Sequence, residues 1–178
     1  LGFGDSEAAT WRSMTTQPNG IVLVTGPTGS GKTVTLYSTL KHLATPEVNV
    51  CTLEDPIEMV EPAFNQVQVL TDIGMGFAEG IRALMRQDPD IIMVGELRDR
   101  ESADICLKAA ETGHLVITSL HTPDVPRAVG RLVGLFPSDE QDTVRARLAD
   151  NLQAVVALRL LMRADAAARM PLIMGDSA

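Results

Sequence analysis

Aromatic and cysteine residues are scarce in this chain of 178 residues. Aromatic side chains make up only 3% of it against 45% hydrophobic residues, so its core must be built from aliphatic side chains. The two cysteines, Cys51 and Cys106, stand apart and form no C-x-x-C pair. This spacing argues against a cysteine-based metal or disulfide site, and we expect both thiols to be buried in a protein of a reducing compartment.

Positive charge is also in short supply. The chain has 15 Lys and Arg residues against 23 Asp and Glu residues, a formal net charge of −8. A broad basic surface for nucleic acid is therefore not expected. The opening residues do not have the pattern of a signal peptide, and no apolar run approaches the roughly 20 residues of a spanning helix. We expect no direct membrane insertion, so any membrane association comes through partners.

The first residue is Leu1 rather than Met, and no strand pattern precedes residue 18. We therefore expect a fragment of a longer protein. It should form a single domain over residues 1–178, with a lead-in segment at 1–18. The tail at 152–178 is left open, because its apolar stretch Leu152–Met162 fits either a strand or a helix.

Apolar runs alternate with longer helical patterns along the rest of the chain. Strands are expected at Ile21–Thr25, Val48–Leu53, Gln66–Leu70, Asp90–Val94 and Leu115–Leu120. Helices are expected at Lys32–Leu43, Phe77–Arg86, Arg100–Thr112, Val125–Leu135 and Asp139–Asp150. This alternation predicts an α/β fold with a largely parallel sheet and flanking helices.

A complete G-x-x-x-x-G-K-[ST] phosphate loop follows the first expected strand directly. The predicted nucleotide-binding residues are Gly26, Pro27, Thr28, Gly29, Ser30, Gly31, Lys32, Thr33 and Val34. The glycines leave backbone N–H groups free to surround anionic oxygens, and the next helix points its positive end at them. Lys32 can reach the β- and γ-phosphates, while the Thr33 hydroxyl is placed to ligate Mg²⁺. The sequence therefore predicts a nucleoside triphosphate site; the alternative is a Gly-rich turn without a ligand.

Acidic residues close two of the other expected strands. Glu54 and Asp55 follow the strand Val48–Leu53, and Glu96 follows the strand Asp90–Val94, after Gly95 in the usual place of a metal-holding Asp. Ligands of open α/β sheets sit at the carboxyl ends of strands, so these acids should lie beside the phosphates. We expect Glu54 or Glu96 to place the attacking water and Glu96 to hold Mg²⁺, directly or through water. A solvated acidic turn and an ordinary charged strand end are the alternatives.

Two histidines bracket the last of the expected parallel strands. His121 follows Thr118 and Ser119 at its carboxyl end, where polar groups can sense the γ-phosphate, so we expect a sensing or water-positioning role. His114 stands at the other end of the strand and is more often a structural residue in such a place.

Four separated segments together resemble one family, the secretion ATPases that drive type II secretion and the assembly or retraction of type IV pili. They are Gly26–Thr33, Thr52–Glu58, Arg86–Asp99 and Thr112–Thr122, which resemble its phosphate loop, acidic box, atypical metal-binding strand and histidine box. The resemblance covers roughly residues 18–160. In this sequence we find no segment that resembles the family's N-terminal domain or the four-cysteine zinc insert that some members carry.

The resemblance implies a RecA-like ATP-hydrolysing motor domain that works with Mg²⁺ in a homo-hexameric ring. The ring would lie on the cytoplasmic face of a bacterial inner membrane, bound to platform or anchoring proteins. An arginine from a neighbouring subunit should complete the site, and Arg98, Arg127 and Arg131 are candidates. Leu135-Phe136-Pro137 looks like the retraction motors, whereas Leu1-Gly2-Phe3 looks like the secretion and extension motors.

Two other functions compete with the motor. One is a nucleotide-binding regulatory module with weak hydrolysis, and the other is a nucleic-acid motor on the same core. The acidic balance and the lack of interleaved aromatic and basic residues count against the second.

Overall fold

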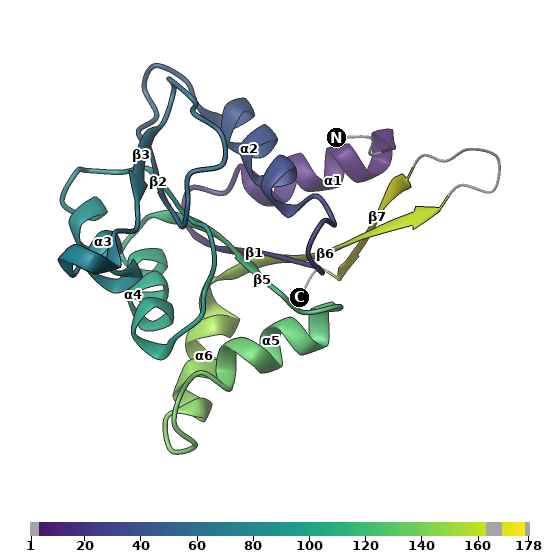
Figure 1. Cartoon of the computed structure of the whole chain (residues 1–178). Coiled ribbons are helices and arrows are strands. Elements are labelled where there is room, and N and C mark those ends of the chain that lie inside the picture. The colour runs from purple at the N-terminus through teal and green to yellow at the C-terminus, as the bar shows by residue number, and fades with distance from the viewer. Residues whose placement is uncertain (1–3, 163–168, 177–178) are drawn as a thin grey trace.

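A computed structural model describes residues 4–162 and 169–176 of the chain (Figure 1). A seven-stranded sheet forms its centre, in the order β3-β2-β4-β5-β1-β6-β7. The strands are β1 (Gly20–Thr25), β2 (Val50–Glu54), β3 (Asn65–Gln68), β4 (Ile91–Val94), β5 (Leu115–Leu120), β6 (Leu152–Met162) and β7 (Arg169–Asp176). All neighbouring pairs are parallel except β6 and β7. The predicted α/β class with a largely parallel sheet is confirmed.

Helices cover both faces of this sheet. Their bounds are α1 (Asp5–Thr15), α2 (Lys32–Leu43), α3 (Phe77–Leu84), α4 (Arg100–Glu111), α5 (Val125–Val133) and α6 (Gln141–Asn151). Side chains alternate across a strand, so β1 sends Ile21 and Leu23 to one core and Val22 and Val24 to the other. Helices α1 and α2 close the second core, and α3 to α6 close the first (Figure 1). Burial on both faces explains why the strands read as continuous apolar runs.

Two elements were not expected from the sequence. The lead-in segment contains α1, whose buried Trp11 donates from Nε1 to Thr39 Oγ1 on α2 at 2.7 Å. The tail contains β7, which pairs with β6, so the stretch Leu152–Met162 is a strand rather than a helix. Both cysteines are buried, as expected, and burial raises the pKa of each thiol.

Arg147 joins α6 to α4 through two carboxylates. Its Nη1 donates to Asp104 Oδ1 at 2.8 Å and its Nη2 to Glu111 Oε2 at 3.1 Å. Replacing Arg147 by leucine leaves both carboxylates without this cation, so we expect the free energy of unfolding to fall by about 1–3 kcal/mol. Arg145→Leu is the matched control: Arg145 is an exposed partner of Asp142 on the same helix, and its loss should cost less than about 1 kcal/mol.

Urea unfolding at two pH values tests the contribution of the Arg147–Asp104 ion pair further. Burial raises the pKa of Asp104, but hydrogen bonds from Lys108 and Arg147 outweigh that effect and hold it below its ordinary 3.8. A carboxylate with a lowered pKa stabilises the folded state above its ordinary pKa and stops doing so as the pH falls through the lowered value. The difference between wild type and Arg147→Leu should therefore shrink well below pH 3.8. An equal difference in acid and at neutral pH would contradict this assignment.

Candidate nucleotide site

The phosphate loop connects β1 to α2 at the carboxyl edge of the sheet. Gly26, Gly29 and Gly31 have φ angles of 153°, 76° and 94°, in the region that favours glycine. At Gly26 the space is also closed, because a Cβ there would lie 2.5 Å from the carbonyl oxygen of Leu158. No side chain caps the first turn of α2, whose N-cap is Gly31. The first N–H groups of α2 are thus left for an anion.

Lys32 lies at the start of α2 and is buried. Its Nζ donates to the carbonyl oxygens of Gly26 at 2.8 Å and Pro27 at 3.1 Å, and lies 3.4 Å from His121 Nδ1. Burial lowers the pKa of Lys32, while the charges of Glu96 and Glu58 act in the opposite direction. A largely desolvated ammonium group interacts strongly with any anion that reaches it, because the surrounding medium screens little.

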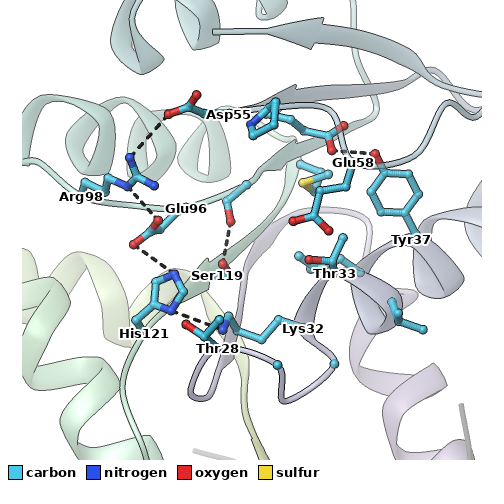
Figure 2. Close-up of a pocket in the computed structure, with 18 of the residues that line it drawn as sticks. Thr28, Lys32, Thr33, Tyr37, Asp55, Glu58, Glu96, Arg98, Ser119 and His121 are labelled. Carbon is cyan, nitrogen blue, oxygen red and sulfur yellow. Dashed lines mark hydrogen bonds and ion pairs between the residues drawn. The ribbon is translucent and has the colours of Figure 1, made fainter.

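A chain of charged groups crosses the cleft from β4 to β5 (Figure 2). Glu96 Oε2 accepts from Arg98 Nε at 2.7 Å, and Glu96 Oε1 lies 3.4 Å from His121 Nε2. Arg98 also reaches Asp55 Oδ2 at 3.5 Å. The predicted residues Glu96 and His121 are therefore brought together beside Lys32, as expected for strands whose carboxyl ends meet at one edge.

Glu54 lies deeper, at the end of β2, and is 4% exposed. Its Oε2 accepts from the Tyr37 hydroxyl at 2.6 Å. Its Oε1 accepts from Thr52 Oγ1 at 2.6 Å and from Gln66 Nε2 at 3.2 Å. Both oxygens of this carboxyl group are thus engaged by neutral donors, as burial of a polar group requires.

Glu58 is a further acidic residue of the cleft, for which the sequence predicted no role. It is exposed, lines the cleft, and lies close enough to Lys32 for its charge to oppose the lowering of that residue's pKa by burial. Figure 2 shows its side chain on the loop after β2, on the side of the cleft where Thr33 lies. The only sequence signal was its place within the acidic segment that closes β2, four residues after Glu54.

The cleft between these groups has a volume of about 500 Å³, within the range of small-molecule sites. Six of the predicted phosphate-loop residues line it: Thr28, Gly29, Gly31, Lys32, Thr33 and Val34. The other three loop residues, Gly26, Pro27 and Ser30, do not line the cleft. Ser30 is buried, and its Oγ finds no hydrogen-bond partner among the described residues.

Three other residues that the sequence suggested for the site each have a polar partner within this chain. His114 is at the amino end of β5, at the opposite edge of the sheet, where its Nδ1 lies 2.9 Å from the carbonyl oxygen of Ala109. Arg98 is held within its own subunit's cleft by Glu96 and Asp55. Arg127 pairs with Asp124 at the start of α5, outside the cleft lining.

Fold and site together define a RecA-like P-loop nucleotide-binding domain. The sequence matches, over residues 1–176, the family described as Type II/IV secretion system protein. The chain belongs to this family, as its four motifs predicted.

Curated relatives are similar over most of the chain. It is 56% identical over 154 residues to the type IV pilus assembly ATPase TfpB of Acinetobacter baylyi, covering 85% of this chain and 26% of that protein. It is 48% identical over 171 residues to the type IV pilus assembly ATPase PilB of Myxococcus xanthus, covering 96% and 29%. The chain thus spans between a quarter and a third of the length of these relatives.

Solved structures agree with the fold. The pilus retraction motor PilT with bound ADP has a TM-score of 0.89 and 37% identity, covering 99% of this chain and 51% of PilT. The Legionella pneumophila ATPase DotB has a TM-score of 0.86 and 32% identity, covering 95% and 48%. In the part of the chain that the structure describes, we find no helix that is both long and apolar enough to cross a membrane.

Proposed function

We propose that this chain is the ATP-hydrolysing motor domain of a type II secretion or type IV pilus machine. One observation carries the proposal: a complete phosphate loop faces Glu58, Glu96 and His121 across a single cleft. The relatives named as pilus assembly ATPases and the ADP-bound retraction motor support ATP as the ligand.

The loop fits a triphosphate in three ways. The uncapped first turn of α2 offers N–H groups, Lys32 offers a buried positive charge, and the buried Ser30 hydroxyl has no partner among the described residues. Mg²⁺ prefers a few oxygen ligands beside substrate phosphates, and Thr33 and Glu96 supply them, directly or through water. Bound there, Mg²⁺ would neutralise charge on the β- and γ-phosphates.

In this proposal a water attacks the γ-phosphorus in line with the bond to the β–γ bridging oxygen. That bond breaks, ADP leaves with the bridging oxygen, and the water oxygen joins the phosphoryl group to form inorganic phosphate while its proton passes to solvent. Lys32 stabilises the charge that develops on the phosphoryl oxygens. Glu58 orients the water, because its carboxylate faces the loop, whereas both oxygens of Glu54 are already engaged. His121, between Lys32 and Glu96, senses the loss of the γ-phosphate.

We further propose that the domain works in a homo-hexameric ring bound to inner-membrane platform proteins on the cytoplasmic side. The relatives named as pilus assembly ATPases and the family described as Type II/IV secretion system protein support work within such a machine. Arg98 lines the cleft of its own chain beside Glu96 and Asp55, whereas Arg127 and Arg131 lie outside the cleft lining, so these two are the candidates for the arginine expected from a neighbour.

Phosphate release measured against protein concentration tests the proposal. A motor whose site is completed by a neighbour should release phosphate at a rate per subunit that rises steeply as the protein assembles. A low rate that does not change with concentration, despite tight ATP binding, would favour the regulatory module. Salt-dependent binding of single-stranded DNA that stimulates turnover would favour a nucleic-acid motor.

A further inference from the structure

Residues 55–61, the first part of the loop between β2 and β3, carry Glu58 and are hydrogen-bonded to side chains of the edge strand β3. We call this segment the acidic loop. Gln68 Oε1 accepts from the Ile57 amide at 3.3 Å, and Gln66 Oε1 accepts from the Glu61 amide at 2.7 Å. Gln66 Nε2 donates to the Met59 carbonyl oxygen at 2.9 Å. Gln66 and Gln68 share one face of β3, so their side chains bind the loop backbone at alternate residues, on both sides of Glu58.

Tyr37 ties the same loop to the helix that begins at the phosphate loop. It is buried on α2, four residues after Thr33, and so on the same side of that helix. Its hydroxyl lies 2.9 Å from the Met59 carbonyl oxygen and 2.6 Å from Glu54 Oε2, and it accepts from Gln66 Nε2 at 2.9 Å. One hydroxyl group thus joins α2, β2, β3 and the acidic loop.

The chemistry of this cluster favours a fixed arrangement. Burial and the Glu54 carboxylate raise the pKa of Tyr37 far above its ordinary value, so the phenol stays protonated and keeps donating. Glu54 is 4% exposed, and the loss of a donor to a buried carboxyl group is costly. The two buried members, Tyr37 and Glu54, are hydrogen-bonded to each other, so a shift of the hydroxyl leaves a buried polar group without its partner, which favours one arrangement.

We propose that Tyr37 and Gln66 are positioning residues, which act through the Met59 and Glu61 backbone to set the place of Glu58 over the phosphate loop. The inference rests on the proposed function, in which Glu58 orients the attacking water. Neither side chain needs to contact the nucleotide. Both bind the backbone of the acidic loop, which carries the water-orienting carboxylate of Glu58. Because Tyr37 and Thr33 belong to one helix, this contact also sets the position of the acidic loop relative to Thr33.

Three variants test this in the complete protein that contains the chain. Tyr37→Phe removes only the hydroxyl, and we expect kcat for ATP to fall about tenfold while KM changes less than about twofold, because misplacement of a reacting group lowers turnover more than binding. Gln66→Leu should speed hydrogen exchange of the Glu61 amide about tenfold or more. Thr39→Val is the control: it removes a buried hydroxyl from the same helix, but one that faces Trp11, and should change neither quantity more than about twofold.

A double-mutant cycle separates positioning from a general loss of structure. If Tyr37 acts through Glu58, then Tyr37→Phe should lower kcat by less than about twofold when Glu58→Gln is already present. An equal loss in both backgrounds would overturn the proposal, and so would unchanged Glu61 exchange in Gln66→Leu. A wild-type protein without ATP turnover, but with faster Glu61 exchange in Gln66→Leu, would contradict the proposed hydrolysis while supporting the role of β3 in holding the loop.

Discussion

Replacing Lys32 by alanine is expected to weaken ATP binding by about a hundredfold or more and to remove measurable turnover. Among the described residues that line the cleft, the lysine and arginine side chains are Lys32 and Arg98. Arg98 pairs with Glu96 and Asp55, so Lys32 supplies the positive charge at the phosphate loop. Leaving phosphate charge without a buried partner costs about 3–5 kcal/mol, and each 1.4 kcal/mol corresponds to about a factor of ten in affinity. Calorimetric titration with ATP and Mg²⁺ measures the change.

Lys108→Ala is the matched control for this substitution. Lys108 is an exposed lysine on α4 that pairs with Asp104, far along the chain from the loop. Its loss should leave the affinity for ATP within about twofold. Because Lys32 also bonds to the Gly26 and Pro27 carbonyl oxygens, thermal unfolding of Lys32→Ala should be recorded beside the titration. ATP affinity within tenfold of wild type in a folded Lys32→Ala protein would contradict the assigned phosphate contact.

Glu96→Gln is expected to separate binding from turnover. The amide keeps an oxygen in place but loses the charge that Arg98 and His121 face. We expect the dissociation constant of ATP to change less than about fivefold and kcat to fall by about 10²–10³, because the Mg²⁺ that Glu96 would help to hold could no longer stabilise the charge developing on the phosphates as well. Binding and phosphate release should be measured on the same preparation of assembled protein.

Glu140→Gln supplies the control for this second substitution. Glu140 also pairs with an arginine, Arg100, but it lies before α6 and outside the cleft lining. We expect kcat within about twofold of wild type. Retained turnover in Glu96→Gln would refute the role of Glu96 in hydrolysis, whereas loss of turnover in both variants would indicate a general effect of breaking surface ion pairs.

Much of this site could be predicted because its position follows from the strands. Buried parallel strands read as apolar runs, so β1, β4 and β5 were located from the sequence, and their carboxyl ends carry Gly26, Glu96 and His121. The phosphate loop was predicted from spacing alone. Helix α2 has the predicted bounds, and the ends of the other predicted elements differ by at most two residues, where helix and strand ends fray.

The unpredicted parts depend on contacts between residues far apart in the chain. Helix α1 has few apolar residues, and its Trp11 is buried in a core shared with β1, α2 and β6 and hydrogen-bonded to Thr39. Glu54 and Glu58 have the same charge and stand four residues apart, so sequence alone could not tell which is buried. The difference arises because Tyr37 and Gln66, 17 and 12 residues away from Glu54, supply its donors.

A structure of the protein with a non-hydrolysable ATP analogue and Mg²⁺ tests the central claim most directly. We predict that the β- and γ-phosphates lie against the amides of the loop from Gly26 to Thr33. Lys32 Nζ should leave the Gly26 and Pro27 carbonyl oxygens for the phosphates, with Glu58 and Glu96 on either side of the γ-phosphate. An analogue bound away from the loop, or a γ-phosphate out of reach of both acids, would contradict the account.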